Sequence, residues 1–503
     1  MKRIISGLVA LIMTIVLLAV PTAAANTTGE IPITVKHQIK DHDGSSSFVY
    51  SDSYFNRSGY DFRLDLANAS LAMNFAAGSS YEAQKENKPE KETQNWESFA
   101  KQTGFQNAEG NEWMHKKARA NSAGVSAAEK PYTDSKGKAT LIAVGFRGAG
   151  YRSEWGGNFN LGDTGEHQGF AIVRDEALKF IKSYIKKHNI TGRIKVWVSG
   201  YSRAAAGANL FAGKLDDGYD LGNGTKLNPE DLYAYTFETP LGATSSEVQD
   251  QKYDNIHNII NPNDLVTYLA FTDWGFARYG LDHYIPVKGS PNYDSYKSAL
   301  LNKLKSVDND PEDYLDQYWA DAFQGYSVTN GRAVRNQETP KEFYKVLGKS
   351  ATTYFVTSRK DYVDNLQNEI VTFLEGYKQQ NKPDESVAFT ILTKKLQENA
   401  DAVLKSLNNG SFAALLTDYL AESFKEAGIT DLNADNYRHL LQEIGKRLQN
   451  MYRNDPSTTV TFIRNIYIVF SSHLQETTYS WLQVLPESVL KANTGHSYHL
   501  FDE

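Results

Sequence analysis

Residues 196–206 read VWVSGYSRAAA, and this short stretch decides the fold. It joins a β-rich apolar run to a tight turn at Ser202 and then to an alanine-rich segment with high helix propensity. Where a strand turns directly into a helix, the two backbones approach closely, so the positions two before and two after the turn residue must be small. Gly200 and Ala204 occupy these positions. The stretch therefore predicts a nucleophile elbow that presents Ser202.

A second interpretation of the same stretch is a serine that caps the helix of an ordinary strand-to-helix turn. The pattern Gly-x-Ser-x-Ala is weak on its own, but the strand before it and the small-residue helix after it favour the elbow. In an elbow, the helix N-terminus offers main-chain N–H groups and a positive dipole end that stabilise an oxyanion. Ser202 is therefore the candidate nucleophile, and the main-chain N–H of Arg203 is a candidate oxyanion donor.

Strand-like and helix-like segments alternate outward from this stretch. Residues 139–146, 193–199, 232–237 and 256–260 are β-rich and apolar, while residues 169–187 have helical spacing. This alternation predicts a largely parallel sheet covered by helices. The chain is therefore expected to have an α/β core.

The second half of the chain has a different character. From about residue 291, polar stretches carry apolar residues at helical spacing, for example Val363, Leu366, Ile370 and Phe373. These helices are expected to form a large insertion or cap. Whether they cover a site as a lid or only enlarge the core stays open.

The N-terminal residues have the pattern of a secretory signal. Lys2 and Arg3 precede an apolar run over residues 8–20, and three alanines at 23–25 follow it. The alternative is an uncleaved anchor, but the run is short for a bilayer span of about 20 residues. We expect cleavage after residue 25 and a secreted protein. Residues 84–95 are a charged run that is expected to be a solvated loop.

Composition excludes several classes of protein. The 503 residues include no cysteine, so disulfides, zinc-thiolate sites and cysteine nucleophiles are impossible. The net charge is -7, and the basic residues are scattered along the chain, so no nucleic-acid partner is expected. The sequence does not determine the oligomeric state.

The motifs across residues 139–287 together resemble the class 3 (fungal-type) lipase family, in both order and spacing. Besides the elbow, the motifs that carry the resemblance are VGFRGAG (144–150), EW (154–155), NF (158–159), HQGF (167–170), YTFETP (235–240) and NPNDLV (261–266). The resemblance implies an α/β-hydrolase core with a mostly parallel sheet and, here, a large all-helical insertion.

The resemblance also implies site residues. Asp264 follows a β-rich run and matches the triad acid, although such an aspartate could also be a turn or cap residue. Ala149 matches the position of the second oxyanion donor, where the family usually has serine or threonine. The main-chain N–H is retained there, but a hydroxyl donor is not.

The general base is harder to choose among the eleven histidines. His257 and His283 fall in predicted strands and are expected to be structural, whereas His439 lies in a polar helix and is expected to be a surface residue. His473 and the helix expected after it resemble the histidine-then-helix pattern at the C-terminal end of secreted bacterial relatives of the family. His496 is the alternative, because fungal members also place their histidine near the C-terminus. We favour His473 and retain His496.

The predicted division of the chain follows from these assignments. It comprises a signal peptide (1–25), an N-terminal extension (26–100) covering an edge of the sheet, an α/β-hydrolase core (101–290), a helical insertion or cap (291–470) and a C-terminal segment that returns the histidine (471–503).

The resemblance implies a secreted serine carboxylester hydrolase that acts on an ester, most simply a lipid, at a possible lipid interface, without metal or organic cofactor. Two alternatives stay open. One is a serine hydrolase for non-lipid esters or amides. The other is a non-catalytic extracellular or cell-surface binding protein that retains the fold.

Overall fold

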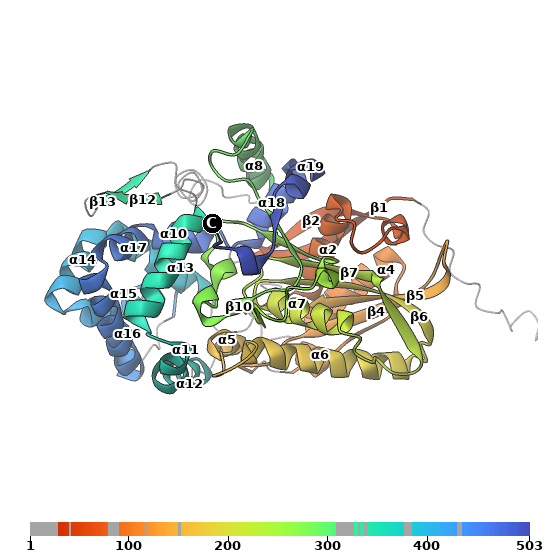
Figure 1. Cartoon of the computed structure of the whole chain (residues 1–503), viewed down its shortest axis with the longest axis horizontal. Coiled ribbons are helices and arrows are strands. Elements are labelled where there is room, and N and C mark those ends of the chain that lie inside the picture. The colour runs from red at the N-terminus through yellow and green to blue at the C-terminus, as the bar shows by residue number, and fades with distance from the viewer. Residues whose placement is uncertain are drawn as a thin grey trace, which may run out of the picture.

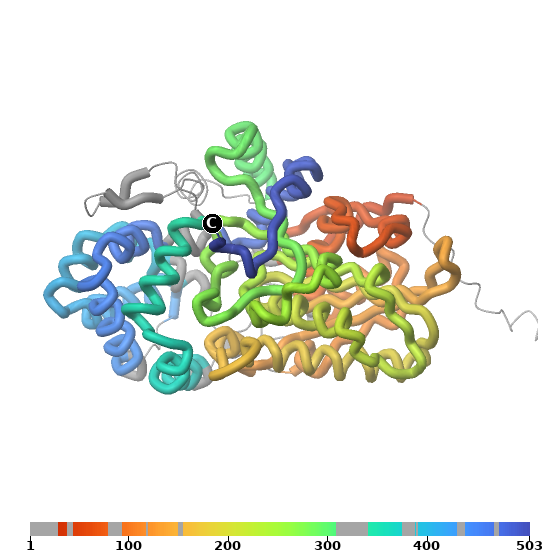
Figure 2. The backbone as a smooth tube through the Cα atoms, viewed as in Figure 1, coloured from red at the N-terminus to blue at the C-terminus, as the bar shows by residue number. Residues whose placement is uncertain are grey.

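The computed structural model describes residues 29–39, 42–78, 90–116, 119–148, 152–307, 326–329, 332–335, 340–376, 385–429 and 435–502. The predicted signal peptide, residues 1–25, lies outside the described residues. A sheet with helices on both faces forms one side of the molecule, and a helical region lies beside it (Figures 1 and 2).

An eight-stranded sheet forms the core of this side of the molecule. Its middle strands β5, β6, β7, β9 and β11 are parallel, and antiparallel strands close both edges. In spatial order the strands are β14 (Thr494–Gly495), β11 (Leu281–Tyr284), β9 (Ile256–Ile260), β7 (Thr225–Phe237), β6 (Gly192–Tyr201), β5 (Gly137–Phe146), β4 (Val125–Asp134) and β3 (Gln106–Gly110).

The middle strands are apolar on both faces because helices cover both faces. In β6, Trp197 packs on one side of the sheet and Val196 and Val198 on the other, and all three are fully buried. One face carries α6 (Gln168–Lys187) and α7 (Arg203–Asp216). The opposite face carries α2 (Leu64–Ala77), α4 (Glu90–Thr103), α8 (Tyr293–Val307) and α18 (Gln475–Val484).

The N-terminal region differs from its prediction. It is part of the core and not a cover for an edge, because α2 packs across β5, β6 and β7. The boundary predicted at residue 100 falls inside α4, whose first residues come from the charged run expected to be a loop. Trp96 and Phe99 are buried under the sheet, so the second half of this helix belongs to the core. Residues 84–89 of that run lie outside the described residues.

The helical region has an apolar core of its own. Its helical segments are α10 (Pro340–Ser350), η7 (Ala351–Phe355), α11 (Arg359–Tyr362), η8 (Val363–Gln367), α12 (Asn368–Gly376), α13 (Glu385–Glu398), α14 (Ala400–Asn409), α15 (Phe412–Glu426), α16 (Asp435–Asn454) and α17 (Pro456–Ser471). A two-stranded hairpin, β12 (Tyr326–Thr329) with β13 (Arg332–Arg335), interrupts a region expected to be all-helical. Helix α8, which was assigned to this region, packs instead against α18 at the sheet.

Shorter elements connect these parts. They are β1 (Ile31–Ile39), β2 (His42–Tyr50), η1 (Asp52–Asn56), η2 (Glu112–Met114), α5 (Arg152–Trp155), η3 (Gly156–Phe159), β8 (Ala243–Thr244), η4 (Gln251–Tyr253), η5 (Leu265–Tyr268), η6 (Thr272–Trp274), β10 (Phe276–Ala277), α19 (Glu487–Ala492) and η9 (Ser497–His499). The helical region packs on η3, η5 and η6, which lie at the carboxyl end of the parallel strands. No helix within the described ranges is both long and apolar enough to cross a bilayer.

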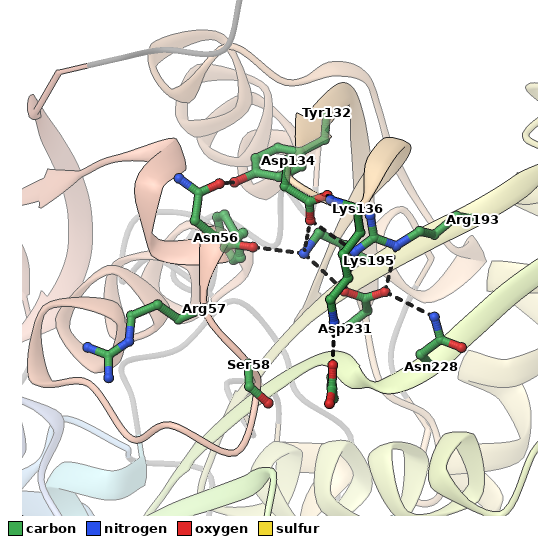
Figure 3. A network of polar contacts seen from close by, with 12 residues as sticks. Asn56, Arg57, Ser58, Tyr132, Asp134, Lys136, Arg193, Lys195, Asn228 and Asp231 are labelled. Atoms are coloured by element: carbon green, nitrogen blue, oxygen red, sulfur yellow. Dashed lines mark hydrogen bonds and ion pairs between the residues drawn. The ribbon is translucent and has the colours of Figure 1, made fainter.

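A buried ion network occupies the opposite, amino end of β6 (Figure 3). Lys195 contacts Asp134 at 2.8 Å and Asp231 at 3.0 Å, and Arg193 bonds both aspartates with distances of 2.7–2.9 Å. Lys195 also donates to the main-chain carbonyl of Phe55 at 2.8 Å. The network therefore fastens the N-terminal region to the sheet.

Candidate active site

Ser202 lies in a strained turn between β6 and α7. Its backbone angles are φ 56° and ψ -131°, a conformation that residues with a side chain rarely adopt. A Cβ added to Gly200 would lie 2.6 Å from the carbonyl oxygen of Ala204, so glycine is required there. The turn has the geometry of a nucleophile elbow, with the serine at the carboxyl end of a central strand.

His473 connects Ser202 to Asp264 through two short hydrogen bonds. The His473 Nε2 atom lies 2.6 Å from Ser202 Oγ, and Nδ1 lies 2.5 Å from Asp264 Oδ2. Because the carboxylate can only accept, Nδ1 carries the proton and Nε2 is free to accept the serine proton. The structure thus brings together the three residues chosen from the sequence.

Asp264 is held in place by its own loop. It follows β9, is completely buried, and accepts a hydrogen bond from the main-chain N–H of Val266 at 2.8 Å through Oδ1. This leaves Oδ2 facing His473, whose side chain is 20% exposed. The base therefore lies where a substrate can reach it, and the acid does not.

The other candidate histidines are engaged elsewhere. His496 Nε2 lies 2.9 Å from Asp254 Oδ1, and His439 is 77% exposed beside Glu369. His257 and His283 are buried and lie 3.0 Å apart. Burial lowers the pKa of His257 to about 3 and that of His283 to about 4. None of these histidines contacts Ser202.

Of the two expected oxyanion donors, only Arg203 lies within the described residues. Arg203 is the first residue of α7, so its main-chain N–H has no partner inside the helix. Ala149 lies outside the described residues. Its neighbour Gly148 lies beside Gln475, whose amide nitrogen is 3.9 Å from the position that a Cβ on Gly148 would take. No sequence pattern predicts a role for Gln475.

Buried charges support the flanks of this loop. Arg147, just before it, donates to Glu154, just after it, at 2.6 Å, and both side chains are completely buried. The guanidinium of Arg203 lies alongside and donates to the carbonyl of Ala120 at 3.3 Å. Burial lowers the pKa of Arg203. The side chain of the residue after the nucleophile is therefore buried beside Ala120 and Gly157.

Glu238 is a second residue that the sequence did not single out. It is completely buried, has a left-handed backbone with φ 48°, and lies beside Asp264. Its carboxyl accepts from Thr478 Oγ1 at 2.6 Å and from the main-chain N–H of Asn261 at 2.8 Å. Burial and the charge of Asp264 raise the pKa of Glu238 well above its usual range.

A cavity of about 480 Å³ lies on the far side of the Asp264 loop, between η5, η6, α10 and the C-terminal segment. Leu265, Tyr268, Leu347 and Phe501 are among the side chains that line it. Ser202 and His473 are not, so we assign no role in the site to this cavity. In the described part of the chain, no group of three or more carboxylate and histidine side chains could hold a metal ion.

The sheet topology and the elbow define the core of the chain as an α/β-hydrolase fold, as the sequence predicts. No family model and no curated protein matches the chain. Among solved structures the chain is similar to fungal lipases, which is the family whose motifs it resembles.

Three solved structures illustrate this likeness. A triacylglycerol lipase described as having a serine protease triad matches with a TM-score of 0.31 and 17% identity, over 44% of this chain and 78% of that one. A lipase from Rhizopus microsporus var. chinensis matches with a TM-score of 0.30 and 14% identity, over 53% and 80%. A fungal lipase in an inhibitor complex matches with a TM-score of 0.26 and 21% identity, over 32% and 62%. The chain thus spans less than two thirds of the last of these proteins.

Proposed function

We propose that the chain is a serine carboxylester hydrolase in which Ser202, His473 and Asp264 form the catalytic triad. The observation that carries this proposal is the pair of hydrogen bonds, 2.6 Å and 2.5 Å, that joins the elbow serine to a buried carboxylate through one histidine. This arrangement is the one that activates a serine hydroxyl for acyl transfer.

The proposed reaction has two steps. His473 takes the proton of Ser202 as the serine oxygen attacks the ester carbonyl, and Asp264 stabilises the imidazolium that forms. The main-chain N–H groups of Arg203 and Ala149 hold the tetrahedral oxyanion until the alcohol leaves with the proton from His473. Water, deprotonated by the same histidine, then releases the acid from the serine.

A fluorophosphonate probe tests the proposed triad directly. We expect the purified protein to be labelled, and labelling to be lost in Ser202→Ala and reduced at least about 1,000-fold in His473→Ala. His496→Ala is the matched control, because that histidine bonds Asp254 and not Ser202. A folded wild-type protein that is never labelled would refute the triad and favour the alternative of a non-catalytic binding protein.

We further propose a lipid ester as the substrate. The motif resemblance supports this, and so does Trp155, a large apolar side chain that is 46% exposed next to the buried Glu154. Trp155→Ala should lower hydrolysis of emulsified long-chain esters several-fold and leave a soluble short-chain ester unaffected. Equal losses on both substrates would contradict a lipid-contacting role for Trp155.

Secretion is a separate proposal, supported by the signal pattern of residues 1–25. Expression of the full chain in a bacterial host should release a protein whose N-terminus is Asn26. Retention of the complete chain in the membrane fraction would instead support an uncleaved anchor.

A further inference from the structure

Glu238 occupies a position that is costly for a glutamate in two ways. It adopts a left-handed backbone conformation, which is strained for a residue other than glycine. Its carboxyl is also completely buried. Strained conformations of this kind persist where the surrounding structure imposes them, and they cluster at active sites.

The contacts of Glu238 join the parts of the chain that build the triad. One carboxyl oxygen accepts from Thr478 on α18, the helix that follows His473, and the other accepts from Asn261, three residues before Asp264. Asn261 in turn donates to the carbonyl of Ser472 at 3.4 Å. Glu238 therefore lies between the acid loop and the segment that carries the base.

No cation balances Glu238 in the described structure. Arg278, whose charge acts on the same region, is bound to Asp282 by hydrogen bonds of 2.7 Å and 2.6 Å. Tyr201, Tyr268 and Glu476 also face this region, and burial holds the pKa of both tyrosines above the usual range, so both are neutral.

The remaining neighbours of Glu238 are Asp264 and His473. Two adjacent carboxylates without a cation cannot both be ionised in a buried site. Asp264 accepts hydrogen bonds from His473 and from the Val266 N–H, whereas burial and the charge of Asp264 raise the pKa of Glu238 well above its usual range. The proton of the pair is therefore expected to reside on Glu238, where it can be donated to Asp264.

We propose that Glu238 is a neutral positioning residue whose carboxylic acid donates a hydrogen bond to Asp264 and so fixes that carboxylate against His473. The proposal rests on the triad proposed above. It assigns to Glu238 no contact with substrate: the residue acts through Asp264.

The catalytic test compares the wild type with Glu238→Gln and Glu238→Ala. Glutamine keeps a donor of the same shape, so its kcat should lie between those of the other two proteins and closer to the wild type. Alanine removes the donor, so kcat should fall about 10-fold to 100-fold with little change in KM. At alkaline pH the wild-type activity should fall as Glu238 ionises, and the glutamine variant should not show this fall.

The matched control is Asp216→Asn. Asp216 is partly buried, which raises its pKa to about 7, but it lies at the opposite end of α7, about 20 Å along the helix from Ser202. This substitution removes a carboxyl with a raised pKa and should leave the pH profile of kcat unchanged. Superimposable pH profiles for wild type and Glu238→Gln, or a folded Glu238→Ala with unchanged kcat, would overturn the proposal.

A second measurement does not depend on catalysis. A neutral Glu238 means that the folded protein holds one proton more than the unfolded chain above pH of about 4.3, so its stability falls as pH rises. The quantity to measure is the unfolding equilibrium constant of Glu238→Gln divided by that of the wild type. Above pH of about 4.3, this ratio should decrease about tenfold for each pH unit. A difference independent of pH would show that Glu238 is charged. If this difference appears while no fluorophosphonate labelling occurs, the neutral acid stands and the proposed function fails.

Discussion

The two ends of strand β6 hold buried carboxyl pairs in opposite electrostatic environments. At the amino end, Asp134 and Asp231 meet Arg193 and Lys195. Burial alone would raise the pKa of these aspartates, but hydrogen bonds from the two cations outweigh it and lower both pKa values. At the carboxyl end, no arginine or lysine among the described residues bonds Glu238 or Asp264, and the pKa of Glu238 is raised.

The difference shows how one sheet can serve two purposes. Two cations neutralise two carboxylates at the amino end, and the charge there fastens the N-terminal region to the core. At the carboxyl end the net negative charge is available to an imidazolium, which is what the proposed reaction requires of Asp264. The first pair should therefore affect stability, and the second should affect rate.

The largest effect is expected from Asp264→Asn. The amide cannot replace the carboxylate in holding Nδ1–H and stabilising the imidazolium, so kcat should fall by about 1,000-fold or more while the unfolding midpoint changes little. Steady-state ester hydrolysis and thermal unfolding measure the two quantities. Asp254→Asn breaks a similar Asp–His contact, with His496, and should leave kcat within about twofold. A similar loss of kcat in both variants would show that the Asp264–His473 contact has no special role in the reaction.

The opposite pattern is expected from Asp231→Asn at the other end of β6. Removal of one carboxylate leaves Lys195 and Arg193 with a single buried counter-charge, so the free energy of unfolding should fall by about 3 kcal/mol. Chemical denaturation gives this value, and active-site titration gives kcat per folded molecule, which should be unchanged. A stable variant with reduced kcat would show that the network serves the site.

The two ends should also respond to pH in opposite directions. At the amino end the carboxyl pKa values are lowered, so their stabilisation is complete above the unfolded value of about 3.9 and is lost as pH falls through the folded values. The stability gap between the wild type and Asp231→Asn should therefore be constant above pH of about 5 and shrink below about 4. Denaturation series at several pH values measure this gap, and a gap that widens in acid would contradict the assignment.

The smallest effect is expected from Lys136→Ala. Lys136 pairs with Glu230 next to the buried network, but their side chains are 53% and 54% exposed. Water screens such a pair, so the free energy of unfolding should change by less than about 0.5 kcal/mol. A loss approaching that of Asp231→Asn would mean that the network extends to the surface.

The sequence predicts the elbow and the core strands because these features depend on residues that are neighbours in the chain. The elbow follows from the small residues at 200 and 204, and the strands of the sheet core follow from apolar runs that are buried on both faces. The choice of His473 over His496 used a resemblance, and only the fold shows that it is His473 that reaches Ser202.

Other features depend on distant parts of the chain, so their sequence pattern was not informative. Glu238 lay within a quoted motif, but its burial beside Asp264 results from the pairing of β7 with β9. The charged run before Trp96 suggested a loop because the apolar residues of its helix, Trp96 and Phe99, come only after the run and pack on a sheet formed later in the chain. Gln475 approaches Gly148 only after the C-terminal segment folds back onto the core.

The wide separation of Ser202 and His473, 271 residues apart, has a consequence for synthesis. At roughly 5–20 residues per second, a ribosome needs on the order of 10–60 s to pass from the serine codon to the histidine codon. During that interval the sheet can form with its elbow serine in place, but the serine has no base. If the proposed triad is correct, the nascent chain stays unreactive until His473 has been made and has folded against Ser202.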